Sequence, residues 1–495
     1  MKKFFLLLLI VPFLWAGSCS SNDNSPEGIK VTLNKTSVTL ITGKTVKLTA
    51  VVTPANTPNK AVTWSTSNSS VVTVSAGTVT AVAEGSATIT VTTKDGGKTA
   101  DCIVTVTQRP VTDIGAKDGL SNKTAAEYFE EKNIFIGWNL GNGFDAGAGY
   151  GSWTRKIDEN FLPKIKEEGF SMVRIPVTWN VSINRILTST GSGAATVWDY
   201  SSFNETNFRT TLTEVKQVVD WAYDAGLVTI VNIHHDGSGT NGWLSITRAA
   251  TNTGIYDGMT SVFTKIWELI AEEFKDYGDW LIFEPFNELH NGGWGWGTIN
   301  PDEFDVINDL NQIFTDTVRA AGGKNTERFL VIQPYCAKPH QSLEDTFVLP
   351  TDTTANKQIV SIHYYDPEPF ALRGTDTNWG SAADYLRITN DFERYASKFT
   401  ENNIPVIMGE SGATYQNRTD TAQLATAQAN RLLYMDWMGS EARRNKIVPV
   451  YWDNGTTSAS SIGENFGLWD RRPNGDLNVI PGMQEVIDAM INAVQ

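Results

Sequence analysis

Apolar runs alternate with amphipathic helical patterns through the chain after residue 119. Each run is short and continuous, and most are followed by a segment in which apolar residues recur at helical spacing. Buried parallel strands have this texture, and each needs a crossover helix to return to the same edge of the sheet. About eight such units predict a (β/α)8 barrel, also called a TIM barrel, over residues 120–495. The predicted strands lie within 134–140, 172–179, 228–234, 281–287, 328–334, 359–365, 405–410 and 448–452.

A different pattern covers residues 28–107, where short alternating strands rich in Val and Thr are separated by turn residues. Strands of this length predict a small all-β sandwich, with Trp64 in its core. Residues 62–91 resemble a bacterial Ig-like domain of group 2, which is usually a spacer. The segment 108–119 combines Pro, Gly and charge without periodicity, so we expect a linker there. The fold class is therefore α/β, an α/β barrel preceded by an Ig-like sandwich.

The first residues have the pattern of an export signal. Two lysines precede an apolar stretch that is too short to span a bilayer, and small residues then lead to Cys19. This arrangement resembles a bacterial lipobox, which implies a signal peptide over 1–18, lipidation of Cys19 and a tether over 19–27. An ordinary cleaved signal is the alternative. By the same resemblance, the mature protein would be an outer-membrane lipoprotein on the surface of a Gram-negative bacterium.

Charge and composition narrow the kind of partner. The formal net charge is −15 and basic residues form no block, which argues against nucleic acid or anionic lipid; the lipid on Cys19 would be the only membrane contact. The chain has 16 tryptophans, whose amphipathic rings suit the flat faces of sugars. We expect a monomer. Cys102 and Cys336 lie in separate predicted modules, so both are expected to be buried free thiols.

Two of the predicted barrel strands lead directly into a glutamate, in LIFEPFNELH and IPVIMGESGA. Burying a carboxylate is costly unless it has partners or a function. If both strands belong to one barrel, Glu288 and Glu410 face each other across the pocket at the carboxyl ends of the strands. A facing pair of carboxyl groups is what cleavage of a glycosidic bond requires.

The remaining strand ends supply further polar and aromatic side chains, and three of the five histidines in the protein are among them. Active sites of (β/α)8 barrels are built from these positions. The predicted pocket lining is Asn139, Asn142, Arg174, His234, His235, Asn287, Glu288, Gln333, His363, Tyr365, Glu410 and Trp452.

Seven segments in order along the barrel resemble the strand-end signatures of glycoside hydrolase family 5. The opening WNLGN and the segment NIHHD are similar to subfamily 4, whose members are endo-acting on β-1,4-glucans. These signatures are WNLGNGFDA, VRIPVTW, VNIHHD, FEPFNE, IHYYDP, MGESG and VYWDNG.

The resemblance implies a role for each catalytic position. Glu288 would be the acid/base and Glu410 the nucleophile, with their carboxyl groups about 5 to 5.5 Å apart, which gives retention of configuration. Asn287 would donate a hydrogen bond to the sugar 2-hydroxyl. Arg174 would lower the pKa of Glu410 and hold it ionised, although it could also be a structural salt bridge inside the barrel mouth, and both could hold.

The other pocket residues are assigned by the same resemblance. His234 and His363 would contact sugar hydroxyls or the glutamates, and Tyr365 would lie against Glu410. Trp452 would form the floor of the subsite where the bond is cut, or else pack in the core. Asn142 is expected to support the substrate site, and His235 either supports it or only packs behind it.

A loop with the sequence HNGGWGWG follows Glu288 directly and is not part of the family signature. Its glycines allow Trp294 and Trp296 to project toward the leaving-group side of the cleft. The same tryptophans could instead anchor the loop on the barrel.

The sequence therefore indicates a retaining endo-β-1,4-glucanase of the cellulase type that needs no cofactor and binds β-glucan polysaccharide. Xyloglucan, mixed-linkage β-glucan and mannan are alternative substrates for the same barrel. Two alternatives come from other classes. One is a non-catalytic glycan-binding surface lipoprotein. The other is a metal-dependent hydrolase built on the adjacent histidines, with Asp236 as the nearest acidic partner, which we disfavour.

Overall fold

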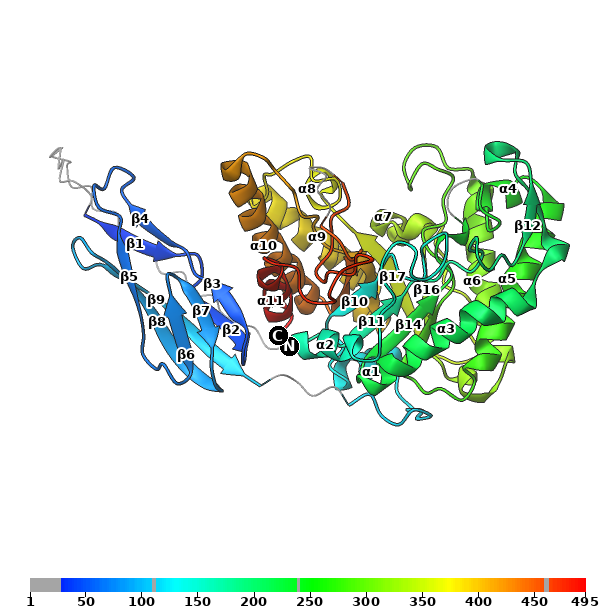
Figure 1. Cartoon of the computed structure of the whole chain (residues 1–495), viewed down its shortest axis with the longest axis horizontal. Helices are drawn as coiled ribbons and strands as arrows, with labels where there is room; N and C mark the ends of the chain where they lie inside the picture. Colours follow the sequence, from blue (N-terminus) through cyan, green and yellow to red (C-terminus); the bar gives the residue numbers. More distant parts are fainter. Residues whose placement is uncertain (1–27, 109–112, 238–240, 458–462) are drawn as a thin grey trace, which may run out of the picture.

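The computed structural model describes residues 28–108, 113–237, 241–457 and 463–495. A β-sandwich module lies at one end of the molecule and a larger barrel at the other (Figure 1). Cys19 and the rest of the expected export signal and tether lie outside the described residues. Among the helices in the described ranges, none combines the length and apolarity needed to span a bilayer.

The N-terminal module is all β, as the sequence predicts. A four-stranded sheet in the order β2-β9-β8-β5 packs with a three-stranded sheet in the order β3-β7-β6, and β1 pairs with β4. Its strands are β1 (Lys30–Leu33), β2 (Ser37–Ile41), β3 (Thr45–Lys47), β4 (Ala50–Thr53), β5 (Val62–Thr66), β6 (Val72–Ser75), β7 (Thr78–Ala81), β8 (Gly85–Thr93) and β9 (Thr99–Thr107).

Valines, isoleucines and leucines on the inner faces of the two sheets form the core of the module. Trp64 is only partly buried and packs against this core and against the smaller cluster of Val31, Val52 and Val91. It therefore joins the two clusters rather than filling the centre of one. Cys102 lies in the core as a free thiol, and Cys336 is a buried free thiol in the barrel, as expected.

The second module is a closed barrel of eight parallel strands in the described part of the chain, in the order β10-β11-β14-β15-β16-β17-β18-β19. The first strand pairs with the last, which closes the barrel. The strands are β10 (Gly137–Leu140), β11 (Met172–Ile175), β14 (Val228–Asn232), β15 (Leu281–Glu284), β16 (Leu330–Ile332), β17 (Gln358–Tyr364), β18 (Val406–Ser411) and β19 (Ile447–Asp453). Each lies where the apolar runs predict it, and nearly every strand residue is buried.

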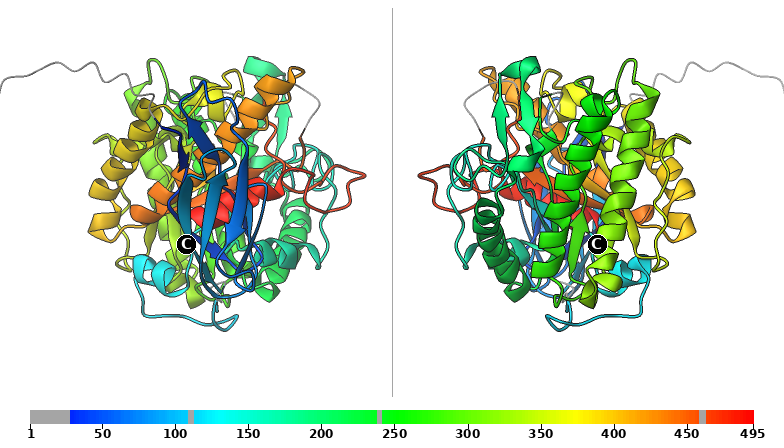
Figure 2. Two further views of the ribbon diagram at one scale, coloured as in Figure 1. Left: turned by 90° about the vertical axis from the view of Figure 1, so that its left-hand side faces the viewer. Right: turned by 90° about the vertical axis from the view of Figure 1, so that its right-hand side faces the viewer.

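Amphipathic helices surround the strands and shield them from solvent (Figures 1 and 2). Side-chain caps mark several helix starts, including Asn204, Asn252, Ser381 and Asp420. The connection after β16 contains one α-helix, the short α7. The α-helices are α1 (Ala125–Glu131), α2 (Phe161–Glu168), α3 (Glu205–Asp224), α4 (Ile246–Ala249), α5 (Thr253–Glu273), α6 (Pro301–Ala320), α7 (Pro339–Leu343), α8 (Glu368–Ala371), α9 (Ala382–Lys398), α10 (Thr421–Arg444) and α11 (Gln484–Ala493).

The expected linker is shorter at its C-terminal end than the sequence predicts. Ile114 is buried in the barrel core cluster, and the carbonyl oxygen of Lys117 accepts hydrogen bonds from the Trp280 indole and the Gly278 amide. Residues 114–119 therefore pack on the barrel. Apolar periodicity could not reveal this, because the anchoring groups are mostly backbone atoms.

The β-sandwich lies against the outside of the barrel (Figure 2, left). Its strands β2 and β3 contact α11, and ion pairs join Lys44 to Glu168 of α2 and Lys35 to Asp436 of α10. Lys44 is nearly buried there and bridges Glu168 and Asp488, with its Nζ 3.3 Å from Asp488 Oδ1. Thr45 donates to the same Asp488 carboxylate from its backbone N–H at 3.1 Å and its hydroxyl at 2.8 Å. Ile41 adds an apolar contact with the barrel core. The modules thus share a specific, partly buried polar interface.

We predict that Lys44→Met uncouples the two modules. The change leaves two neighbouring carboxylates without their cation, and removing one member of a buried ion cluster costs about 3 kcal/mol. In urea, the wild-type protein should unfold in one transition, whereas the variant should show a separate, earlier transition for the sandwich. Lys60→Met, which changes an exposed lysine of the same module, should unfold like the wild type. A single unchanged transition in Lys44→Met would contradict this interpretation.

Candidate active site

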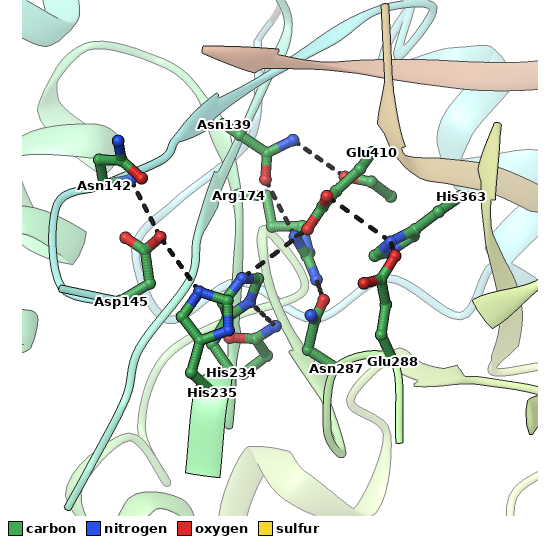
Figure 3. Close-up of polar contacts among 12 residues, drawn as sticks. Asn139, Asn142, Asp145, Arg174, His234, His235, Asn287, Glu288, His363 and Glu410 are labelled. Atoms are coloured by element: carbon green, nitrogen blue, oxygen red, sulfur yellow. Dashed lines mark hydrogen bonds and ion pairs between the residues drawn. The ribbon is translucent and has the colours of Figure 1, made fainter. Parts of the chain in front are cut away.

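The polar residues expected at the strand ends converge at the carboxyl mouth of the barrel (Figure 3). Glu410 lies within β18, where the register against β19 shifts between Met408 and Ser411. A bulge of this kind redirects a side chain. Gly409 makes it possible, because a Cβ atom there would lie 2.5 Å from Ser361 Oγ. Glu288 follows β15 and has a φ of 45°, an uncommon backbone conformation for a residue other than glycine.

The two glutamates form a close pair around one histidine. His363 Nδ1 lies 2.6 Å from Glu288 Oε1 and 3.7 Å from Glu410 Oε2. One oxygen of each carboxyl group lies within 4.8 Å of the other. This spacing is below the separation of about 6.5 to 9.5 Å that is typical of an inverting pair and is compatible with that of a retaining pair, about 5 to 5.5 Å.

Arg174 is fully buried and connects several of the site residues. Its Nη1 donates to Glu410 Oε1 and to Asn139 Oδ1, both at 3.1 Å. Its Nη2 donates to Asn287 Oδ1 at 2.7 Å. Because Oδ1 of Asn287 accepts this bond, the Nδ2 donors of that amide are directed away from Arg174.

Glu284 is a further acidic residue of this network that sequence reasoning missed. It is the last residue of β15, is fully buried, and accepts a hydrogen bond from Arg174 Nε at 2.6 Å. Arg174 thus forms a structural ion pair with Glu284 inside the barrel mouth and also contacts Glu410. The FEPFNE segment contains both Glu284 and Glu288, and the family resemblance gives a role to Glu288 alone.

The charges around the pair set its protonation. Burial is the largest influence on the pKa of Glu410 and raises it; His363 and Arg174 oppose the rise without cancelling it. Burial also raises the pKa of Glu288, but His363, Lys338 and His290 bring its net pKa below the ordinary value. Arg174 therefore lowers the pKa of Glu410 as expected, but burial and the charge of Glu288 outweigh it, so the net pKa of Glu410 lies above the ordinary value.

His234, Tyr365 and Trp452 lie around Glu410. The Tyr365 hydroxyl donates to Glu410 Oε2 at 3.2 Å, and His234 Nε2 lies 3.8 Å from Oε1. The Trp452 ring is parallel to the His234 ring, with centroids 5.8 Å apart and 7° between the planes. Trp452 is 7% exposed, so most of the ring is packed and only part of it faces the pocket.

His235 and Asn142 lie further along the mouth, next to Asp145. The Asn142 backbone N–H donates to Asp145 Oδ2 at 3.0 Å, and its side-chain amide donates to the Asn454 carbonyl at 3.2 Å. His235 Nε2 lies 3.9 Å from Asp145 Oδ2. Burial raises the pKa of Asp145 to about 7. Asn142 thus holds the first loop in place.

Two groups of side chains in the described residues have the donor atoms for a metal ion. One is Asp145 with His234 and His235, and the other is Glu288 with His363 and Glu410; in each, the donor atoms lie within 4.8 Å of one another. The sequence suggested Asp236 as the acidic neighbour of the histidine pair, but the structure places Asp145 there. Asp236 instead accepts hydrogen bonds from two backbone N–H groups and from the Trp243 indole at 2.7 Å.

The loop after Glu288 is ordered by its own contacts and presents two tryptophans. Trp294 stacks on His290 with centroids 4.2 Å apart, and Trp296 stacks on His340 at 4.5 Å. Both tryptophans are 56% exposed. Their stacked faces anchor the rings, and their exposed surface is left for a ligand, so both roles that the sequence allowed are compatible.

The same loop is held onto the segment after β16. The Asn291 backbone N–H donates to the Tyr335 hydroxyl at 2.9 Å, and Lys338 Nζ lies 5.6 Å from the Trp296 ring centroid. Lys338 also pairs with Glu368 at 2.9 Å. Since Lys338 and His290 both lower the pKa of Glu288, the loop lies within electrostatic reach of that carboxyl group.

Comparison with protein families finds two matches that divide the chain as the fold does. Residues 131–458 match the model of cellulase, glycosyl hydrolase family 5. Residues 29–104 match the bacterial Ig-like domain, group 2.

Relatives and solved structures agree with the barrel match. The chain is 30% identical to Endoglucanase B of Clostridium cellulovorans, over 72% of this chain and 74% of that protein. It is 31% identical to a xyloglucan-specific endo-beta-1,4-glucanase of Bacteroides ovatus, over 65% of this chain and 63% of that protein. A solved GH5-4 broad specificity endoglucanase from Bacteroides salanitronis superposes with a TM-score of 0.65 at 30% identity, covering 78% of this chain and 99% of that one.

We predict that Arg174→Met strongly destabilises the barrel. The change leaves Glu284 and Glu410 buried without their shared cation, which should lower the free energy of unfolding by about 3 to 5 kcal/mol at neutral pH. Urea unfolding followed by tryptophan fluorescence measures this loss. Arg209→Met, which removes an exposed arginine of α3, should change the free energy by less than about 0.5 kcal/mol. Equal stability of the two variants would contradict the central role of Arg174.

Proposed function

Because the chain belongs to the cellulase family, glycosyl hydrolase family 5, we propose that it cuts β-1,4-linked glucans internally and with retention of configuration. The observation that supports retention is the short separation of Glu288 and Glu410, whose nearest oxygens lie within 4.8 Å. A separation this short is typical of retaining glycosidases, in which one carboxylate attacks the sugar itself.

The different partners of the two glutamates support their roles. Glu410 accepts hydrogen bonds from Arg174 and Tyr365, which are donors that favour the ionised form needed in a nucleophile. Glu288 instead contacts His363, a group that can exchange a proton with it. We therefore assign Glu410 as the nucleophile and Glu288 as the acid/base, although the ligand-free pKa directions run the other way. Binding of substrate displaces water and changes the surroundings of both groups.

The reaction then has two steps. Glu410 attacks the anomeric carbon while Glu288 donates its proton to the glycosidic oxygen, so that the C–O bond breaks and the leaving chain departs as an alcohol. Glu288, now ionised, takes a proton from water, and the resulting hydroxide bonds to the anomeric carbon as Glu410 leaves. Asn287 is oriented by Arg174 to donate to the sugar 2-hydroxyl.

The remaining site residues are proposed to bind the sugar. Trp452 and His234 lie with parallel rings beside Glu410 and form one wall of the subsite where the bond is cut. Asn142 and His235 support this wall, since His235 packs on His234 with ring centroids 4.3 Å apart and both Asn142 and His235 lie next to Asp145. Trp294 and Trp296 extend the site toward the leaving group.

The substrate proposed is a β-1,4-linked glucan. Relatives named as broad specificity and xyloglucan-specific enzymes make xyloglucan and mixed-linkage glucan the first alternatives to cellulose-type chains. Export and a lipid anchor on Cys19 are also proposed; both depend on the sequence of residues 1–27 alone. The enzyme would act as a monomer.

We predict that Glu410→Ala and Glu288→Ala each lower kcat on β-glucan by about 10⁴-fold or more without unfolding the barrel. Added azide separates the two roles. In Glu410→Ala, azide takes the place of the missing nucleophile on an activated aryl β-glucoside and yields the α-glycosyl azide. In Glu288→Ala, azide attacks the glycosyl-enzyme and yields the β-glycosyl azide.

Glu401→Ala, which changes an exposed glutamate outside the pocket, serves as the control and should keep wild-type activity. Exchange of the two azide products between the variants would reverse the assignment. Binding of β-glucan without release of reducing ends by the wild type would identify a glycan-binding protein, and loss of activity with a chelator would identify a metal-dependent hydrolase.

We also predict that the double variant Trp294→Ala/Trp296→Ala weakens binding on the leaving-group side. KM for a cello-oligosaccharide that extends past the cut bond should rise about tenfold, because stacking area on the sugar rings is lost. Cleavage of an aryl cellobioside, which places no sugar there, should change little. Leu386→Ala, an exposed apolar residue on α9, is the control. Equal effects on both substrates would show that the tryptophans only support the loop.

A further inference from the structure

Glu284 carries a negative charge that the proposed mechanism does not use. It lies at the end of β15, in the same buried network as Glu410, and it is fully inaccessible to solvent. A buried carboxylate is costly unless every oxygen is paired. Glu284 meets this condition, since Oε2 accepts from Arg174 Nε at 2.6 Å and from Asn232 Nδ2 at 2.9 Å, and Oε1 accepts from Gln333 Nε2 at 2.8 Å.

This set of donors selects a carboxylate over its amide. All three partners of Glu284 donate, and an ionised carboxyl group offers acceptors only. An amide at the same position would place an NH₂ group against one of the donors. The polar layer across β14, β15 and β16 therefore specifies a charge at residue 284 and does not merely fill space.

The contacts also set the direction of the guanidinium. Glu284 holds Arg174 at Nε, and Asn287 holds it at Nη2, so that Nη1 is directed at Glu410. The bond to Glu284 is 2.6 Å long and the bond to Glu410 is 3.1 Å long. The guanidinium is thus closer to the carboxylate that takes no part in the chemistry.

We propose that Glu284 is a positioning residue that aims Arg174 at Glu410 and at the same time neutralises part of the positive charge that the nucleophile would otherwise experience. This inference rests on the proposed function of Glu410. A nucleophilic carboxylate that is too strongly paired is less reactive, because the charge it must give up in the transition state is stabilised in the ground state. Glu284 thus holds Arg174 beside Glu410 and limits how strongly the guanidinium stabilises the ionised nucleophile in the ground state.

Glu284→Gln tests the proposal through the pH profile. Without the charge at 284, Arg174 acts on Glu410 alone and one neighbouring anion is lost, and both changes favour ionisation of Glu410. The acid limb of the kcat/KM profile, which reports the free nucleophile, should move to lower pH by about one unit. On the plateau, kcat should fall about tenfold with KM little changed.

Two further variants separate charge from packing. Glu284→Asp keeps the charge at a greater distance from Arg174 and should move the acid limb in the same direction by a smaller amount. If Glu284→Gln does not fold, the shift of the acid limb in Glu284→Asp tests the proposal instead. Glu441→Gln, a buried carboxylate of α10 that pairs with Arg444, should leave the limb where it is in the wild type.

An acid limb that stays in place or moves to higher pH in folded Glu284 variants would overturn the inference, because a purely structural role lowers kcat without favouring ionisation. This outcome is distinct from failure of the proposed function. The latter would appear in the wild type itself, as absence of β-glucan hydrolysis or as the wrong azide product from Glu410→Ala.

Discussion

The buried charge of Arg174 is the constraint on which the active site depends. A guanidinium with no access to water must find partners for its N–H groups inside the barrel. It finds Glu284 at the end of β15, Asn287 just after it and Glu410 on β18. Each of these partners is in turn oriented by the bond it accepts. The arrangement of the candidate site is therefore a consequence of satisfying one cation in a medium of low polarity.

His363 plays the complementary part for the second carboxyl group. It lies between the two glutamates and is closer to Glu288 than to Glu410. Glu410 thus accepts hydrogen bonds from Arg174 and Tyr365, whereas Glu288 lies against the His363 ring. The asymmetry of the pair arises from these neighbours and from burial, since the Glu288 side chain is 23% exposed and that of Glu410 only 9%.

The sequence predicted the barrel strands and most of the site residues, but not the role of Glu284 or the net pKa directions. Continuous apolar runs identified all eight barrel strands, because parallel strands shielded by helices leave no alternative pattern. Strand ends located Glu288, Glu410, Arg174 and His363 because the fold brings those ends together. The role of Glu284 was missed, since one strand end carries two glutamates and only the contacts tell them apart. The net pKa directions also needed the structure, because desolvation depends on packing that no motif records.

The docking of the sandwich on α2, α10 and α11 has a consequence for how the enzyme meets its substrate. A module on a free linker lets a catalytic domain swivel and sample many orientations. Here Lys44 and its carboxylate partners fix the angle between the module and the barrel axis. A surface or partner that holds the module would therefore also set the direction in which the mouth of the barrel faces. A polysaccharide chain must then approach the barrel in that fixed orientation, because the barrel does not rotate freely relative to the module.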